Sequence, residues 1–316
     1  MNNPILTIIV PVYNHERYIK KALKSIEIQN IKYTYEVIIG EDCSKDHSRK
    51  ILQEYQLKAS DNYTFIYRDY NWGMLRNISD LFYRARGKYI IVLEGDDYWI
   101  YHNKINEQIN FLESNKEFSG CAHGTVIVNA DGRDSNVRYI WEKGNGIYDA
   151  RDYLHGLLPG QTASFMYRNY FSKEKLFRYL GDNSLYPLDR FIAFVVVSKG
   201  KVYCTNKVWS AYRYVTDRGS SFSAHIDSES VAYAQSALMY HKSIYMYSLL
   251  ENCQNDIVKI SEKLYYKSFF RDSFIDKNRS LKEVIREFRK AKYPIQTLCW
   301  IGIQFMCIIF KNKGEI

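Results

Sequence analysis

The sequence has 316 residues, of which 46% are hydrophobic and 25% are charged. These proportions are ordinary for globular proteins and exclude a chain that is disordered over most of its length. The length predicts two domains, or one large domain with an appendage. The net charge of +9 suits a phosphorylated substrate, an anionic membrane surface or nucleic acid, and the charge alone does not choose among them.

The cysteines and the N-terminus indicate the compartment. The six cysteines are scattered without a CxxC pair, which argues against a disulfide framework or a zinc site and fits a reducing environment. The first apolar run is short and β-branched and has no basic segment before it, so it predicts a buried strand and not a signal peptide. We therefore expect a cytoplasmic protein.

In the first hundred residues, segments whose apolar residues have the spacing of a strand alternate with segments whose apolar residues have the spacing of a helix. An amphipathic helix is predicted over 19–26, a second after Asp46 or Ser48 as N-cap, and a third over 77–85. Strands are predicted over 5–12, 36–40, 63–67 and 89–93. This β-α order predicts an α/β fold with a mostly parallel, Rossmann-like sheet.

The remaining chain is predicted in two parts. Between about 100 and 225 the pattern is mixed, with a helix over 104–112, a strand over 125–129 and a turn at Asp131-Gly132. From about 226 onward it is typical of helices, because glycine and proline become rare. We therefore expect a domain over 1–225 and a helical C-terminal extension over 226–316.

Polar clusters follow three of the predicted strands. Residues 11–14 lie at the carboxyl end of the first strand, residues 41–44 at that of the second, and Asp96-Asp97 at that of the fourth. Ligands of parallel α/β sheets bind beyond the carboxyl ends of the strands. Two adjacent carboxylates there repel each other unless a cation or hydrogen-bond donors neutralise them. A solvated turn or a helix N-cap is the alternative for Asp96-Asp97 alone.

Several motifs together resemble the family 2 glycosyltransferases of bacterial polysaccharide type, which have the nucleotide-sugar-binding GT-A fold. The resemblance is dense over residues 5–100 and thins toward 225. The motifs that carry it occur in the family's order: Val10-Pro11-Val12-Tyr13-Asn14, Glu41-Asp42-Cys43-Ser44-Lys45-Asp46, Asn71-x-Gly73 with Arg76-Asn77, Ala85-x-Gly87-Lys88-Tyr89-Ile90, and Glu94-Gly95-Asp96-Asp97-Tyr98-Trp99.

The resemblance implies roles for individual residues in nucleotide binding. Tyr13 would lie against the nucleobase, and Asp42 would accept a hydrogen bond from a base N–H, which favours uracil or another base with an imide-type donor. Arg76 would contact the base or a phosphate, and Asp96 the sugar or ribose. The full set of implied nucleotide-binding residues is Pro11, Tyr13, Asn14, Asp42, Arg76 and Asp96.

The resemblance also implies a metal ligand and a general base. Asp97 would hold Mn²⁺ or Mg²⁺ on the diphosphate, and such hard cations take oxygen ligands. Asp189, at the start of a predicted helix, would deprotonate the acceptor hydroxyl; the alternative is an acid that only stabilises the helix N-terminus. Arg213 or Arg218 would contribute positive charge to a loop that covers the diphosphate, although the family's usual histidine is missing there.

The C-terminal segment combines basic and apolar stretches. Ser280-x-x-Glu283 predicts a capping box, and basic residues are dense over 277–292. Residues 295–310 carry no charge but would span only about 24 Å as a helix, less than a hydrocarbon core of about 30 Å. We expect residues 277–313 to form an anchor at an anionic membrane surface, with a core or dimer helix as the alternative.

The sequence therefore predicts an inverting, metal-dependent hexosyltransferase that moves one sugar from a nucleoside-diphosphate sugar, with UDP favoured. The acceptor would be a hydroxyl of a glycan or lipid-linked molecule in surface polysaccharide synthesis. Transfer of a single sugar is favoured because the QxxRW motif of processive synthases does not occur. The alternatives are a nucleotidyltransferase that makes nucleotide sugars, whose glycine-rich loop is missing here, and an inactive nucleotide-sugar-binding scaffold. Nucleic acid is not an expected partner, because the basic excess is dispersed.

Overall fold

The computed structural model describes residues 3–141, 144–171, 179–180, 188–215, 231–274 and 279–302. The chain divides into two compact units. The sheet unit comprises Met1–Asp149, Leu157–Phe177 and Leu188–Ile226, and the helical unit comprises Ala150–Gly156, Arg178–Pro187 and Asp227–Ile316. The boundary predicted between residues 225 and 226 lies outside the described residues and stays a prediction.

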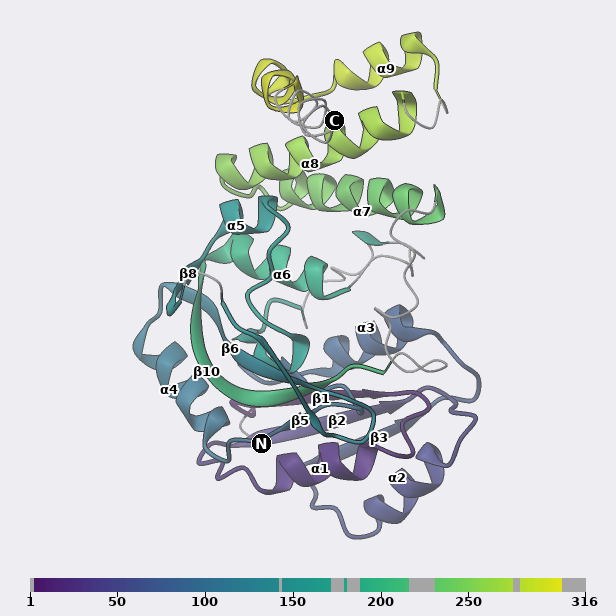
Figure 1. Ribbon diagram of the computed structural model, residues 1–316, viewed down its shortest axis with the longest axis vertical. Coiled ribbons are helices and arrows are strands. Elements are labelled where there is room, and N and C mark those ends of the chain that lie inside the picture. Colours follow the sequence, from purple (N-terminus) through teal and green to yellow (C-terminus); the bar gives the residue numbers. More distant parts are fainter. Residues whose placement is uncertain are drawn as a thin grey trace. The chain divides into compact units, whose positions relative to one another are not determined.

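The described strands of the sheet unit form one sheet in the order β3-β2-β1-β4-β9-β6-β10-β5, with β7 beside β6 and β8 beside β10 (Figure 1). The pairs β1–β2, β1–β4, β2–β3 and β6–β10 are parallel, whereas β9 is antiparallel to β4 and β6. The predicted mixed α/β fold is confirmed, and its sheet is parallel over β3-β2-β1-β4. At the other side of the sheet, β7 is antiparallel to β6, and β5 and β8 are antiparallel to β10. The strands are β1 Leu6–Val12, β2 Tyr35–Glu41, β3 Tyr63–Tyr67, β4 Tyr89–Val92, β5 Tyr98–Trp99, β6 Phe118–Val128, β7 Asp134–Tyr139, β8 Gly146–Tyr148, β9 Met166–Arg168 and β10 Lys201–Arg213.

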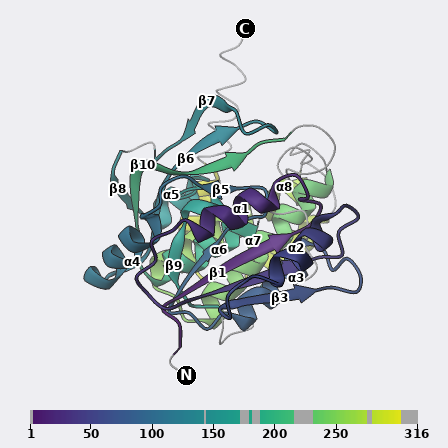
Figure 2. The ribbon, with the colours of Figure 1, turned by 90° about the horizontal axis from the view of Figure 1, so that it is seen from below.

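Helices cover both faces of this sheet. Figures 1 and 2 show α1 and α2 on one face and α3 and α6 on the other. Strand β1 is buried throughout its first five residues, as its continuous apolar run predicts, because it has neighbours at both edges and helices over both faces. The helices of this unit are α1 Ile19–Glu27, α2 Ser48–Gln56, α3 Met74–Arg84, α4 Lys104–Ser114, the 3₁₀ turn η1 Thr162–Ser164, and α6 Leu188–Lys199.

Helix α1 shows how the apolar spacing produces packing. Its buried apolar residues are Ile19, Ala22, Leu23 and Ile26, the i, i+3, i+4, i+7 set that the sequence predicts. These side chains join the main core cluster with β1, β2 and β4. Burying each large aliphatic side chain contributes roughly 1.5–3 kcal/mol, so this face stabilises the docking of α1 on the sheet.

Two predicted helix starts differ from those observed. Helix α3 begins at Met74, earlier than the predicted residue 77, after Gly73 takes a φ of +79° that other residues avoid. Helix α2 has His47 at its N-cap without a side-chain bond. Asp46 instead accepts a hydrogen bond from the Ser48 N–H, so it satisfies one of the free donors at this helix start.

The helical unit contains α5 Ala150–Leu154, α7 Val231–Leu250, α8 Asn255–Phe274 and α9 Leu281–Phe288. The predicted capping box of Ser280 and Glu283 opens α9. Glu262 of α8 is fully buried and accepts hydrogen bonds from the Tyr245 and Thr297 hydroxyls and from the backbone of 292 and 293. This carboxylate thereby fixes the segment after α9 to α8. Within the described part of the chain, no helix has the length and apolarity to cross a membrane.

Candidate active site

The loops after β1, β2 and β4 meet at one edge of the sheet. The Asp42 N–H donates to the Val12 carbonyl at 2.9 Å, and the Gly95 N–H donates to the Pro11 carbonyl at 3.2 Å. The parallel register, which pairs Val12 with Glu41, places these carboxyl ends side by side. The structure thus brings together the three polar clusters that the sequence singles out.

Asn14 joins the first loop to the second. It takes a positive φ of 57°, which asparagine tolerates better than most residues. Its N–H donates to the Ser44 hydroxyl at 3.0 Å, and its side-chain oxygen accepts from the Lys45 N–H at 2.9 Å. The position of Asn14 therefore fixes the geometry of the loop that also carries the half-buried Tyr13.

Asp42 is buried at the centre of this edge. Its Oδ1 accepts a hydrogen bond from the Trp72 N–H at 2.7 Å. Burial raises the pKa of Asp42, while hydrogen bonds from the Trp72 and Gly73 backbone oppose that shift. The side chain is thus held rigidly, with one oxygen satisfied by the protein.

Arg76 lies on the exposed side of the start of α3. Its guanidinium stacks over the Trp72 ring at 4.2 Å and donates to the Tyr70 hydroxyl at 3.1 Å. The buried Arg68 lies 4.0 Å from the same ring. Because the Trp72 backbone also holds Asp42, Arg76 belongs to the same local cluster as that predicted base-binding carboxylate.

Three acidic residues crowd the end of β4. Asp96 and Asp97 are buried, and the Asp97 Oδ1 accepts from the Arg213 N–H at 2.8 Å. The Asp97 Oδ2 is also buried and has no hydrogen-bond partner. Burial and then the charges of Asp96 and Glu94 raise the pKa of Asp97 well above its usual value. Burial and the charges of Asp96 and Asp189 raise the pKa of Glu94 to about 8.

This acidic cluster fits a divalent cation. Asp97 offers a buried oxygen without a donor, and the neighbouring carboxylates make that position strongly attractive to positive charge. Among the residues that the structure describes, no group of three or more His, Cys, Asp and Glu side chains is arranged to hold a metal. A cation at Asp97 would share its remaining ligand positions with substrate phosphates, as Mg²⁺ commonly does.

Arg213 is the last residue of strand β10, and its predicted contribution to a diphosphate-covering loop stays a prediction. Tyr212 and Arg213 still pair with Ile127 and Val128, which keeps the chain in the sheet. The buried guanidinium donates to the backbone carbonyls of Asp96, Asn129 and Ala130, so it joins the loop of the acidic cluster to the chain that follows β6. Arg218 lies outside the described residues.

His15 lies beside the acidic cluster, and the sequence did not predict a role for it. Its Nε2 lies 3.9 Å from the Asp96 Oδ1, and its Nδ1 is buried without a hydrogen-bond partner. A Cβ atom at Gly95 would come within 2.6 Å of that Nδ1, so the glycine leaves space for the ring. In the sequence, His15 directly follows the first motif, and this position could have identified it as a candidate site residue.

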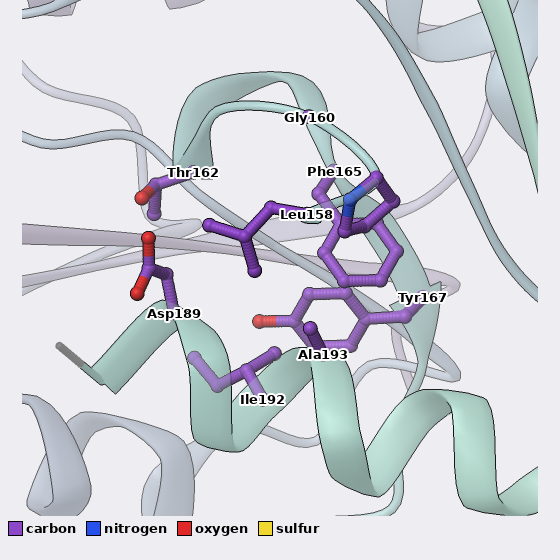
Figure 3. Close-up of a pocket in the computed structure, with 9 residues that line it drawn as sticks. Leu158, Gly160, Thr162, Phe165, Tyr167, Asp189, Ile192 and Ala193 are labelled. Carbon is purple, nitrogen blue, oxygen red and sulfur yellow. The ribbon is translucent and has the colours of Figure 1, made fainter. Parts of the chain in front are cut away.

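Asp189 lies in the first turn of α6 and lines a small pocket on the same unit (Figure 3). Its Oδ1 accepts from the Arg190 N–H at 2.7 Å. Burial raises its pKa, so Asp189 holds a proton more tightly than an ordinary aspartate. Its negative charge also raises the pKa of Glu94, so the pocket and the acidic cluster interact electrostatically.

The comparison with known protein families decides which family the chain belongs to. The sequence profile described as Glycosyl transferase family 2 matches residues 7–176, more than half of the chain. The chain belongs to glycosyl transferase family 2. The match covers β1 to β9, including Asp42 and the acidic cluster, and it ends before Asp189.

Relatives and solved structures agree with this family. An uncharacterized protein of Mycobacterium tuberculosis is 28% identical over 212 residues, which are 66% of this chain and 58% of that protein. The Bacillus subtilis protein named glycosyltransferase EpsH is 24% identical over 304 residues, 96% of this chain and 78% of that one. The chain thus spans little more than half the length of the mycobacterial relative.

The fold is that of the GT-A glycosyltransferases. The structure of S. aureus TarS residues 1–349 in complex with UDP-GlcNAc has a TM-score of 0.58 and 17% identity, and covers 92% of this chain and 81% of that one. A likeness at this identity establishes the fold. The predicted GT-A architecture is confirmed.

Proposed function

We propose that this family member is an inverting glycosyltransferase that moves one sugar from a UDP-sugar to a hydroxyl of a glycan or lipid-linked acceptor. Surface polysaccharide synthesis is the process we propose for it. The observation that carries the proposal is the buried Asp97 Oδ2, which has no donor and lies beside Asp96 and Glu94. Such a buried carboxyl is neutralised either by a proton or by an external cation, and the divalent cation that accompanies a sugar diphosphate would supply the second.

The nucleotide would bind along the loops after β1 and β2. Tyr13 and Asn14 would flank the base and ribose, with Pro11 at the base of the loop. Asp42 has one oxygen bound to the Trp72 N–H, and the other could accept from the imide N–H of uracil. The UDP-GlcNAc complex of the structurally similar TarS is consistent with a UDP donor.

Asp97 would hold Mn²⁺ or Mg²⁺ against the diphosphate, and Asp96 would contact the sugar or ribose. When bound, the cation would neutralise the negative charge that develops on the leaving diphosphate. The Arg213 N–H fixes one oxygen of Asp97, so the unpartnered oxygen is the one that would bind the cation.

Asp189 would act as general base. It would take the proton of the acceptor hydroxyl while the oxygen forms a bond to the anomeric carbon. The bond from that carbon to the diphosphate oxygen breaks, and its electron pair leaves with the diphosphate. Burial raises the pKa of Asp189, which makes it a stronger base than an exposed aspartate.

The helical unit would place the enzyme at an anionic membrane surface. Leu281 and Ile285 of α9 are 64% and 48% exposed, and the basic Lys282 and Arg286 lie on the same helix. Exposed apolar side chains among basic ones are typical of interfacial helices. Residues 277–278 and 303–313 of the proposed anchor lie outside the described residues, and a core or dimer role for 295–310 remains the alternative.

The proposal is tested by incubating the full chain with UDP-GlcNAc, UDP-glucose, UDP-galactose and GDP-mannose, each with and without Mn²⁺. We expect thermal stabilisation and slow nucleotide release with at least one UDP-sugar, and only when Mn²⁺ is present. Stabilisation by none of the four donors would contradict the proposal. Release of pyrophosphate from a sugar phosphate and UTP would instead identify a nucleotidyltransferase.

A further inference from the structure

The pocket beside Asp189 has room for a single small group. Its volume is about 10 Å³, which is close to the minimum that accommodates one water molecule. The lining is apolar except for three side chains that carry oxygen, those of Thr162, Tyr167 and Asp189. The pocket is formed by three segments, 158–165, β9 and the first two turns of α6.

Tyr167 is the unexplained member of this pocket. The residue is 2% exposed, and its hydroxyl has no hydrogen-bond partner. Its ring packs against Phe165 and Phe171 at centroid distances of 4.9 and 5.7 Å, so its position is fixed. Figure 3 shows the hydroxyl directed toward the side of the pocket where the Asp189 carboxylate lies.

Other buried tyrosines of the sheet unit do not share this feature. Tyr148 is fully buried, and its hydroxyl donates to the Leu157 carbonyl at 3.0 Å. Tyr89 is also fully buried, and its hydroxyl donates to the Glu113 carboxylate at 3.0 Å. Buried hydroxyls are nearly always paired, so an unpaired one aimed into a water-sized space indicates a ligand oxygen.

We propose that Tyr167 and Asp189 together hold one oxygen atom in this pocket, and that during transfer this oxygen is the attacking hydroxyl of the acceptor. The inference rests on the proposed function, because it takes Asp189 as the base. The acceptor O–H donates to the Asp189 carboxylate and accepts from the Tyr167 O–H. The proton passes to Asp189, the oxygen's free pair bonds to the anomeric carbon, and Tyr167 keeps its own proton.

The geometry gives Tyr167 a defined effect on the reaction. Burial raises the pKa of Tyr167 well above its ordinary value, so the hydroxyl remains a donor throughout the working pH range. Through the shared oxygen it stabilises the charged form of Asp189, and it also fixes the direction of the attacking lone pair. In the absence of an acceptor, one water molecule occupies the same position.

A crystal structure of the full chain, without donor, tests the oxygen site independently of activity. We expect one ordered water within hydrogen-bond distance of both the Tyr167 hydroxyl and the Asp189 carboxylate, and we expect it to be lost in Tyr167→Phe. A dry pocket in the wild-type protein, or a protein partner on the Tyr167 hydroxyl, would overturn the inference. Neither result depends on whether the protein transfers sugar.

Hydrolysis of UDP-GlcNAc with Mn²⁺ tests the role in the reaction, because water then serves as the acceptor. Tyr167→Phe should lower kcat roughly tenfold with little change in the KM for donor, and should move the acidic limb of the kcat profile to higher pH. The shift follows because the Asp189 carboxylate loses an indirect donor. Tyr148→Phe is the matched control and should leave the pH profile unchanged.

The two possible failures are distinguishable. If Asp189→Asn is inactive but Tyr167→Phe keeps the wild-type rate and pH profile, the inference about Tyr167 is wrong and the base assignment stands. If Asp189→Asn itself hydrolyses UDP-GlcNAc at the wild-type rate, the proposed function of Asp189 fails.

Discussion

The carboxylates of Asp97 and Asp189 lie in the same unit but in contrasting surroundings. Asp97 is 1% exposed and lies among other acids, whose charges add to the effect of burial on its pKa. Asp189 lies in a mostly apolar pocket, and burial alone raises its pKa, against the opposing charge and N–H of Arg190. A bound cation relieves the repulsion between Asp97 and its acidic neighbours. The apolar pocket around Asp189 instead suits a carboxylate that takes up and releases a proton. The two regions are therefore suited to different chemical tasks.

The largest effect is expected from Asp97→Asn. At a donor concentration one hundred times the Kd, the wild-type protein should gain about 2.7 kcal/mol of stability from UDP-GlcNAc and Mn²⁺. The variant should lose this gain, because its amide cannot supply the anionic ligand. Thermal shift with and without Mn²⁺ measures the difference. Equal stabilisation of both proteins would remove Asp97 from the metal site.

Asp189→Asn should separate chemistry from binding. We expect Mn²⁺-dependent thermal stabilisation by donor to persist while turnover falls roughly 10²–10⁴-fold, the usual scale for loss of a general base. UDP release and thermal shift on the same preparation provide the two readouts. A variant that loses donor binding along with turnover would show that Asp189 belongs to the donor site.

The pH dependence of turnover follows from the direction of the Asp189 shift. Burial raises its pKa above the ordinary value of about 3.9, so the reactive carboxylate form is lost at a higher pH than for an exposed aspartate. Activity should therefore fall as pH decreases through that raised pKa. A kcat profile at saturating donor and Mn²⁺ measures it. An acidic limb at or below the ordinary value is not compatible with Asp189 as base.

Substitutions in the helical unit should have the smallest effect on the reaction steps that depend on Asp97 and Asp189. The double variant Leu281→Gln, Ile285→Gln should co-sediment less with vesicles of phosphatidylglycerol and phosphatidylethanolamine, by about 1 kcal/mol or more per side chain. Its hydrolysis of UDP-GlcNAc should not change. Leu57→Gln, at a residue of the sheet unit that is 90% exposed, is the matched control. Vesicle binding equal to wild type, or none by the wild type at low salt, would rule out this surface.

Substitutions are preferable here to a deletion of the whole C-terminal segment. Glu262 is fully buried and is satisfied by the backbone of 292 and 293 and by Thr297. A deletion before α9 would remove three of the four hydrogen-bond donors described for that carboxylate, together with the chain that covers it, and would keep the Tyr245 hydroxyl. Such a protein would lose stability for a reason unrelated to membranes.

The donor side of the site could be predicted from sequence because its determinants are local. Strand β3 has the predicted bounds, and the loops with Asp42 and Asp97 follow their strands directly. The parallel register then brings these loops together without further information. Motif order and apolar runs therefore sufficed for the fold and for these positions.

The remaining features depend on contacts between distant segments. Arg213 stays in the sheet because β10 pairs with β6 as far as Val128, which no local pattern around Arg213 reveals. The position of His15 depends on the space left by Gly95. The role of Tyr167 depends on the lack of a partner for its hydroxyl, and a missing contact has no sequence signal.

The most direct test of the account is NMR observation, with the full chain and Mn²⁺, of the hydrolysis of the UDP-sugar that stabilises the protein in the thermal-shift screen. An inverting reaction, in which Asp189 activates the attacking oxygen on the face opposite the diphosphate, releases the β anomer of the sugar first from this α-linked donor. The account predicts that early β signal, and predicts that Asp189→Asn abolishes it. Initial release of the α anomer, or an unchanged β signal in Asp189→Asn, would contradict the account.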